Sequence, residues 1–278
     1  MNDSKFWSEV SYQIMREVDR AVTPLVGEKE AGETVKMGAD GTPTKLIDLV
    51  AEEKVVQVLE EAERPLTLVS EEIGRIDIGS GSPEVVFVVD PLDGTNNAVK
   101  NIPAYGISLA IAEVTDPDRS MTIHDIELGF VKNFATGDIY QAIQGGGASL
   151  NGQDISTSSR TDISKSSIGA YIYRADMEKV DKLCKMVRRM RILGSVAVEL
   201  CYVADGTYDA FLDIRGNLRI VDVAAAKLIV EEAAGLVTDE YNQPLNSKLN
   251  VLERTSIIAS GNSEVHQELI RLIGGNMI

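Results

Sequence analysis

The chain has 278 residues, of which 27 are basic and 43 are acidic, and its formal net charge is −16. This charge argues against electrostatic binding of nucleic acid, and no apolar run is long enough to span a bilayer. The first residues have no basic start followed by an apolar core, and the two cysteines, Cys184 and Cys201, form no disulfide framework. We therefore expect a cytoplasmic protein that has no membrane or nucleic-acid partner.

Two helices are predicted in the first quarter of the chain. The first covers residues 5–26, where five apolar residues recur at intervals of four: Phe6, Val10, Ile14, Val18 and Val22. A loop rich in glycine and charged residues follows as far as Pro43. The second helix covers residues 46–63 and places Asp48 in its first turn, where the helix dipole alone favours a carboxylate.

Two short apolar runs are predicted as buried strands, and each of them ends in acidic residues. Residues 66–69 lead into a Glu-Glu pair that begins at Glu71, although such a pair alone would mean little. Residues 85–89 end in the motif D-P-L-D-G-T, which contains Asp90 and Asp93. Acidic side chains are therefore predicted at the ends of two strands.

The turn after the second of these strands is predicted to lead into a helix. Pro91 and Gly94 favour a tight turn, and Thr95 is predicted to cap the helix that follows. Carboxylates hold hard cations, whereas free amides at the start of a helix hold anions such as phosphate. An isolated D-x-x-D-G-T is also compatible with a purely structural turn, so the motif alone does not decide its role.

Further strands are predicted at residues 105–114, 126–133 and 137–144, and tight turns are predicted at residues 144–152. Beyond these turns, predicted strands alternate with predicted helices, which favours an α/β layer. Asp222 is predicted to open one of the helices, where a capping role alone would explain it. The two histidines, at positions 124 and 266, belong to no motif and are predicted to be surface or capping residues.

Two segments, DPLDGTNNAVKNIPAYGISLAIA from Asp90 and VDVAAAKLIVEEAAG from Val221, resemble the signatures of the inositol monophosphatase and fructose-1,6-bisphosphatase superfamily. Val221 stands where the second signature has tryptophan, and the loop sequence GADGTPTK is similar to the archaeal bifunctional branch. The resemblance implies an α/β fold, a layered αβαβα sandwich, assembled as a homodimer. An N-terminal α+β half, residues 1–150, would carry most of the metal ligands, and a C-terminal α/β half, residues 151–278, would complete the site.

The resemblance also implies a role for each candidate site residue. The expected metal ligands, which would bind two or three Mg²⁺ or Mn²⁺ ions, are Glu71, Asp90, the Leu92 carbonyl, Asp93 and Asp222. Lys36 and Asp40 match positions near a more weakly bound third ion. Thr95, supported by Asp48, would orient a metal-activated water for direct attack on phosphorus. The expected substrate contacts are Asp93, Gly94, Thr95, Arg191, Val196, Asp213 and Arg215.

The predicted function is therefore metal-dependent hydrolysis of a phosphate monoester of a sugar or polyol. Arg191 and Arg215 could bind a second phosphate, which favours fructose-1,6-bisphosphate alongside inositol-1-phosphate. Two alternatives stay open. One is a nucleotide 3′-phosphatase of the same superfamily, although the chain shows no insertion that would hold an adenine. The other is a regulatory protein that binds without catalysis, although the complete set of acids argues against it.

Overall fold

The computed structural model describes residues 1–274 except for residues 2, 40 and 117. The expected contact of Asp40 with a third metal ion therefore lies outside the described residues. Within the described part of the chain, no helix is both long enough and apolar enough to cross a membrane.

Two large β-sheets and a two-stranded hairpin make up the β-structure. The hairpin consists of β1 (Thr34–Met37) and β2 (Pro43–Lys45). The eight-stranded sheet has the order β10-β9-β8-β7-β6-β5-β3-β4 and is formed by β3 (Leu66–Ser70), β4 (Gly74–Ile78), β5 (Val85–Asp93), β6 (Gly106–Glu113), β7 (Ile126–Asn133), β8 (Ile139–Ile143), β9 (Gly147–Leu150) and β10 (Gln153–Asp154). The five-stranded sheet has the order β12-β11-β13-β15-β14 and is formed by β11 (Ser167–Tyr171), β12 (Arg189–Arg191), β13 (Ala210–Arg219), β14 (Leu236–Thr238) and β15 (Arg254–Ser260).

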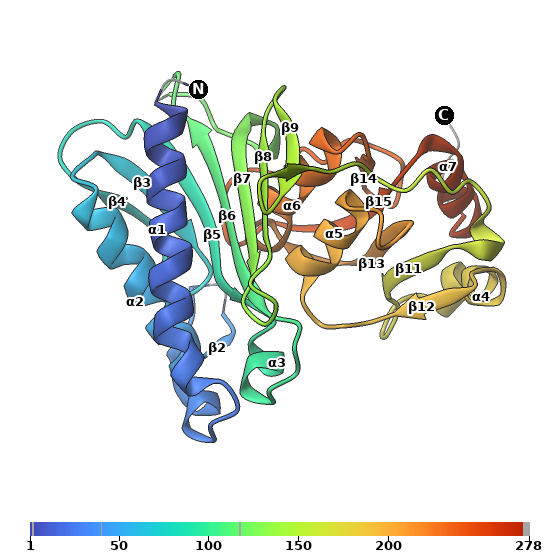
Figure 1. Ribbon diagram of the computed structural model, residues 1–278, viewed down its shortest axis with the longest axis horizontal. Coiled ribbons are helices and arrows are strands. Elements are labelled where there is room, and N and C mark those ends of the chain that lie inside the picture. The colour runs from blue at the N-terminus through green and yellow to red at the C-terminus, as the bar shows by residue number, and fades with distance from the viewer. Residues whose placement is uncertain (2, 40, 117, 275–278) are drawn as a thin grey trace.

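The helices form three layers that alternate with these two sheets (Figure 1). They are α1 (Ser4–Val22), α2 (Leu46–Glu61), α3 (Thr95–Val99), α4 (Met177–Met186), α5 (Val196–Ala204), α6 (Ile220–Glu232) and α7 (Ser263–Leu272). Short 3₁₀ turns lie at Thr23–Leu25, Glu30–Gly32, Ile123–Asp125 and Ile163–Lys165.

The packing of the layers confirms the predicted sandwich. Helices α1 and α2 share an apolar core with one face of the eight-stranded sheet. Helices α5 and α6 fill the space between the two sheets, and α4 and α7 cover the outer face of the five-stranded sheet (Figure 1). The division expected at residue 150 stays a prediction, since β10, which lies beyond it, still pairs with β9.

Strand β5 positions the acidic residues. All nine of its residues are buried, because its side chains alternate between the layer of α1 and α2 and the layer of α5 and α6. Strand β3 runs parallel to β5, with Ser70 opposite Val89. Glu71 follows Ser70 and Asp90 follows Val89, so the parallel pairing of the two strands brings Glu71 and Asp90 side by side.

One prediction of local structure, the tight turns at residues 144–152, is right only in part, and one is wrong. Residues 144–152 contain β9, which pairs antiparallel with β8, because pairing in the sheet overrides the low strand propensity of glycine. His266, predicted at the surface or as a cap, is 1% exposed. Its ring nitrogens lie 2.8 Å from Ser260 Oγ and 2.9 Å from Thr238 Oγ1, so both are satisfied within the core, and burial lowers the pKa of the imidazole to about 4.

Candidate active site

A cavity of about 700 Å³ opens where β3 and β5 end, and the start of α6 forms its opposite wall. Nine of the predicted site residues line it: Asp48, Glu71, Leu92, Asp93, Gly94, Thr95, Val196, Arg215 and Asp222. Asp90, Arg191 and Asp213 are not part of this lining. The lining residues come from both large sheets and from α2, so residues far apart in the sequence meet here.

The turn that follows Asp90 depends on a glycine. Gly94 has φ +87° and is the N-cap of α3, and a Cβ built at this position would lie 2.8 Å from the Ala104 carbonyl oxygen. The prediction that Thr95 caps the helix is therefore wrong, because Thr95 is the first helical residue. Its side chain is free for another partner.

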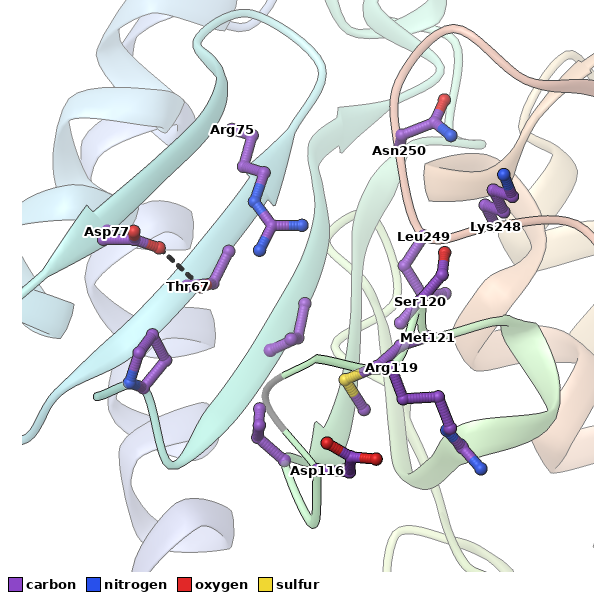
Figure 2. A pocket seen from close by; sticks show the side chains of 13 residues that line it. Thr67, Arg75, Asp77, Asp116, Arg119, Ser120, Met121, Lys248, Leu249 and Asn250 are labelled. Carbon is purple, nitrogen blue, oxygen red and sulfur yellow. Dashed lines mark hydrogen bonds between the residues drawn. The ribbon is translucent and has the colours of Figure 1, made fainter.

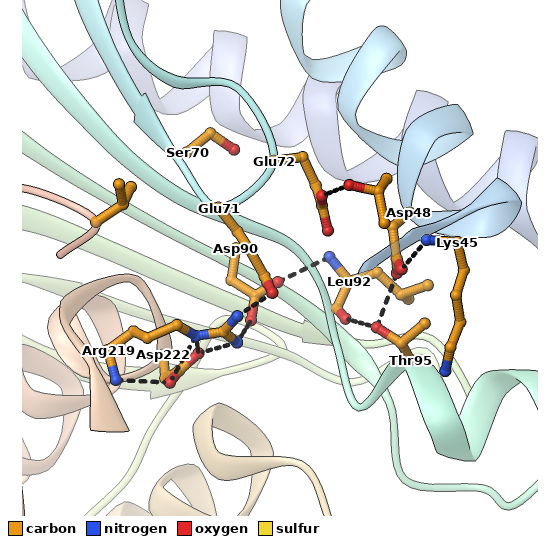
Figure 3. A network of polar contacts seen from close by, with 12 residues as sticks. Lys45, Asp48, Ser70, Glu71, Glu72, Asp90, Leu92, Thr95, Arg219 and Asp222 are labelled. Carbon is orange, nitrogen blue, oxygen red and sulfur yellow. Dashed lines mark hydrogen bonds and ion pairs between the residues drawn. The ribbon is translucent and has the colours of Figure 1, made fainter. Parts of the chain in front are cut away.

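That partner is Asp48. Thr95 Oγ1 lies 2.7 Å from Asp48 Oδ1 and 3.1 Å from the Leu92 carbonyl oxygen (Figure 3). Asp48 is the third residue of α2, and its Oδ2 accepts a hydrogen bond from the Lys45 amide over 3.1 Å. Burial raises the pKa of Asp48, and its hydrogen bond from Thr95 acts in the opposite direction.

Asp93 joins the end of β5 to the start of α5. Its Oδ2 accepts hydrogen bonds from Ser195 Oγ and the Ala197 amide, both over 2.7 Å, and its Oδ1 accepts from the Val196 amide over 3.2 Å. The Val196 amide, expected to contact substrate, is thus directed at Asp93. Burial, reinforced by the charge of Asp222, raises the pKa of Asp93.

Asp90 has a buried oxygen that lacks a hydrogen bond. Its Oδ1 accepts from the Leu92 amide over 3.0 Å, whereas Oδ2 has no hydrogen-bond partner among the residues that the structure describes and lies 3.8 Å from Arg219 Nη2. Burial raises the pKa of Asp90, and the charges of Asp93 and Asp222 raise it further. A buried carboxylate with like charges beside it is a costly arrangement unless a cation binds there.

Asp222 lies at the start of α6, but the prediction that it is the N-cap is wrong. The N-cap is Arg219, and Asp222 is the third helical residue, whose Oδ2 accepts from the Arg219 amide over 2.9 Å. The Arg219 guanidinium lies between Asp222 and Glu71 and contacts both (Figure 3). Arg219 was not among the predicted site residues, although a basic residue three positions before a candidate ligand was an available signal.

The donor set fits a hard cation. Among the residues that the structure describes, no three His, Cys, Asp or Glu side chains are arranged around one point as a metal ion would need. Two of these acids, Glu71 and Asp222, are instead in contact with the Arg219 guanidinium. The ligand type is nevertheless that of Mg²⁺, since carboxylates and the Leu92 carbonyl group belong to residues of one cavity, and Asp90 Oδ2 lacks a hydrogen bond among the described residues. Glu71, Asp90, Leu92, Asp93 and Asp222 could hold such ions.

The basic residues at this site differ in what they contact. Arg215 is bound through two nitrogens to Asp213, at 2.8 and 2.5 Å, and its guanidinium lies 4.2 Å from the centroid of the Tyr173 ring. Arg191 contacts Ser167 Oγ on β11 and does not line the cavity. Arg174, which was not predicted, does line it.

Lys36 lies on β1, where it lines a separate hollow together with Glu52. Glu52 is 2% exposed and accepts a hydrogen bond from Ser70 Oγ over 2.9 Å. Burial raises the pKa of Glu52 to about 7, and the charge of Glu72 adds to this effect. Glu52 was not predicted as a residue of interest, although it lies one helical turn after Asp48.

Another cavity, of about 300 Å³, lies between β3, β4 and the loop at residues 248–250 (Figure 2). Its charged lining residues are Arg75, Asp77, Asp116, Arg119 and Lys248. Only two of these residues are acidic, whereas five acidic residues, Asp48, Glu71, Glu72, Asp93 and Asp222, line the cavity at the end of β5. We therefore place the chemistry in the acidic cavity at the end of β5.

Comparison with known proteins agrees with this geometry. The model of the inositol monophosphatase family matches residues 3–276, so the chain belongs to this family. A protein of Methanothermobacter thermautotrophicus named fructose-1,6-bisphosphatase/inositol-1-monophosphatase is 55% identical over 98% of both chains. The chain is thus a phosphatase, and the predicted family and fold are confirmed.

Two further relatives widen the comparison. A bifunctional NADP phosphatase/NAD kinase of Methanocaldococcus jannaschii is 38% identical over 97% of this chain, which spans 51% of that relative's length. A solved structure from Pyrococcus horikoshii, described as having similarities to inositol-1 monophosphatase, superimposes with a TM-score of 0.80 at 32% identity and covers 97% of each chain.

Proposed function

We propose that this phosphatase hydrolyses fructose-1,6-bisphosphate, inositol-1-phosphate or both, with two or three Mg²⁺ ions, or Mn²⁺ in their place, bound among its acids. The observation that carries the proposal is Asp90 Oδ2, a buried carboxylate oxygen without a hydrogen bond, close to the Thr95–Asp48 pair. The relative at 55% identity, which carries both activities in its name, supports it. A homodimer and a cytoplasmic location stay predictions.

The Thr95–Asp48 pair supplies a route for a proton. Because Thr95 Oγ1 donates to Asp48, its lone pairs can accept a hydrogen bond from an attacking water. As the water oxygen bonds to phosphorus and the ester P–O bond breaks, the proton of the water can pass through Thr95 to Asp48, whose raised pKa favours accepting it. The leaving alkoxide takes a proton from solvent, to which Asp48 later returns its own. Mg²⁺, when bound, would supply positive charge that offsets the negative charge developing on the phosphoryl group. Gly94 and Thr95 remain the proposed phosphoryl contacts, because both line the cavity.

A second phosphate would bind at Arg174. Its side chain is exposed in the cavity, has no hydrogen-bond or ion-pair partner among the described residues, and belongs to a residue held at φ +62°. A guanidinium that is not neutralised can bind a phosphate through two hydrogen bonds. Arg215, whose charge is offset by Asp213, would instead form a wall of the cavity together with Tyr173.

A second candidate substrate is NADP, because a relative named an NADP phosphatase/NAD kinase is 38% identical over nearly the whole chain. Arg174 would then bind a phosphate of the dinucleotide other than the one removed. The same proton route would serve both substrates.

Steady-state phosphate release with Mg²⁺ tests this proposal. The substrates would be fructose-1,6-bisphosphate, inositol-1-phosphate and NADP, each compared by kcat/KM. We expect the first two to be hydrolysed at least as well as NADP. A higher kcat/KM for NADP would replace the proposed substrate, and no release from any of the three would overturn the proposed function.

A further inference from the structure

The Arg219 side chain contacts acids from opposite walls of the site. Its Nη1 donates to Glu71 Oε1, 148 positions earlier in the chain, and its Nη2 lies 2.6 Å from Asp222 Oδ1. Its Nε lies 3.0 Å from the same Asp222 oxygen, and Nη2 is 3.8 Å from Asp90 Oδ2. One guanidinium thus meets three of the proposed metal ligands (Figure 3).

The side chain of Arg219 can move without disturbing the start of α6. Arg219 ends β13 and is the N-cap of α6, and its backbone amide is bonded to Asp222 independently of the guanidinium. Its side chain is 21% exposed, whereas those of Asp222 and Asp90 are 8% and 1% exposed. The guanidinium can therefore leave the acids towards solvent while the helix start keeps its hydrogen bond.

The acids need a cation in this place. Asp90 is buried, and its Oδ2, which has no hydrogen-bond partner among the described residues, lies 3.8 Å from the same Arg219 nitrogen that is 2.6 Å from Asp222. Carboxylates buried this close together repel one another unless a cation compensates their charges. A guanidinium supplies one positive charge and Mg²⁺ supplies two, and both bind through the same carboxylate oxygens. They compete wherever they require the same oxygen.

From these contacts we infer that Arg219 is an internal counter-cation that keeps the acid cluster assembled and must release Glu71 and Asp222 when Mg²⁺ binds there. The inference rests on the proposed function insofar as it takes these acids to be the metal ligands. Its consequence is that Arg219 stabilises the metal-free protein and weakens Mg²⁺ binding. The enzyme then becomes loaded only when the free Mg²⁺ concentration is high enough to displace the guanidinium.

Direct measurement of Mg²⁺ binding tests the inference without reference to activity. The variants are Arg219→Ala, Arg219→Lys and, as the matched control, Arg174→Ala, which removes a positive charge from the same cavity but contacts none of these acids. Isothermal titration with MgCl₂ gives Kd, and thermal unfolding in EDTA and in MgCl₂ gives the stability of both forms. Arg219→Gln, which keeps hydrogen-bond donors, replaces Arg219→Ala if the latter does not fold.

We expect Arg219→Ala to bind Mg²⁺ about tenfold more tightly than the wild type, since the competing charge is lost. The same variant should melt several degrees lower than the wild type in EDTA, because the acids lose their counter-cation. Its melting temperature should rise more on addition of Mg²⁺ than that of the wild type. Arg219→Lys should lie in between, and Arg174→Ala should change Kd much less.

A Kd for Arg219→Ala that equals or exceeds the wild-type value, or that matches the value for Arg174→Ala, would overturn the inference and leave the proposed function intact. A wild-type protein that hydrolyses its substrate but binds no Mg²⁺ in the titration would instead overturn the metal part of the proposed function.

Discussion

Thr95 Oγ1 donates a hydrogen bond of 2.7 Å to Asp48 Oδ1, which joins the first residue of α3 to the first turn of α2, 47 positions earlier. This contact links the acidic turn after β5 to a carboxylate that is not among the proposed metal ligands. In the proposed mechanism this pair accepts the proton of the attacking water, which a site that only binds a cation would not need.

Removing this pair should slow the chemical step. We expect Thr95→Ala and Asp48→Asn each to lower kcat by roughly 10²- to 10⁴-fold, the range for a lost proton-transfer group, with a smaller change in KM. Thr95→Ser, which keeps the hydroxyl, is the matched control and should retain most of the activity. Steady-state kinetics at saturating Mg²⁺ measures the effect, and a Thr95→Ala enzyme with wild-type kcat would rule out the route.

Arg174 should distinguish substrates with one and two phosphates. We expect Arg174→Ala to raise KM for fructose-1,6-bisphosphate by roughly 10- to 100-fold, because the charge-assisted hydrogen bonds to the second phosphate are lost, and to change inositol-1-phosphate turnover little. Arg191→Ala is the comparison, because Arg191 contacts Ser167 outside the cavity. Equal losses on both substrates, or a larger selective loss in Arg191→Ala, would contradict this assignment.

Ser195 should stabilise the folded protein, because its hydroxyl donates a hydrogen bond to a buried carboxylate. Its hydroxyl lies 2.7 Å from Asp93 Oδ2, and both residues are buried. Ser195→Ala should lower the free energy of unfolding by about 1–3 kcal/mol, since Asp93 loses a hydrogen bond inside the protein. Urea unfolding measures this, with the exposed Ser159→Ala as control. A Ser195→Ala protein as stable as the control would show that the contact contributes nothing.

The buried Glu52 should make the free energy of unfolding depend on pH. Burial raises the pKa of Glu52 to about 7 from its ordinary value of 4.5, so the folded protein holds a proton that the unfolded chain releases. Between about pH 4.5 and 7 the stability of the folded state should therefore fall as pH rises, and above pH 7 this effect should be complete.

The matched variants for this effect are Glu52→Gln and the exposed Glu53→Gln. Glu52→Gln removes the ionisation and keeps a partner for Ser70, so it should exceed the wild type in stability by about 1–3 kcal/mol at pH 8 and by little at pH 5. Urea unfolding in EDTA at the two pH values measures the difference. If Glu52→Gln stabilised the protein no more at pH 8 than at pH 5, ionisation of Glu52 would not contribute to the pH dependence of stability.

Much of the site could be predicted because it lies within continuous motifs. The apolar run of β5 and the acids after it are adjacent in the sequence, and the parallel register of β3 and β5 brings Glu71 to Asp90. The pairing of Thr95 with Asp48 was expected only through the family resemblance, since nothing local connects residues 47 positions apart.

The parts that failed depend on contacts that sequence patterns do not encode. Arg219 meets Glu71 across 148 positions, and β13 continues past a register irregularity to place it at the start of α6. The sequence does not show that Gly94 adopts a positive φ and is the N-cap, so Thr95 was wrongly predicted for that position. Arg191 contacts Ser167 because β12 pairs with β11 at the edge of the five-stranded sheet.

We propose that the acids at the end of β5 hold the metal ions on which the phosphatase activity depends. The measurement that tests it most directly is phosphate release from fructose-1,6-bisphosphate across a Mg²⁺ titration that starts in EDTA, for the wild type and for Asp90→Asn. We predict release that rises from zero with Mg²⁺ in the wild type and is lost at every Mg²⁺ concentration in a folded Asp90→Asn protein. Release that persists in EDTA, or an Asp90→Asn enzyme with the wild-type Mg²⁺ dependence, would contradict the account.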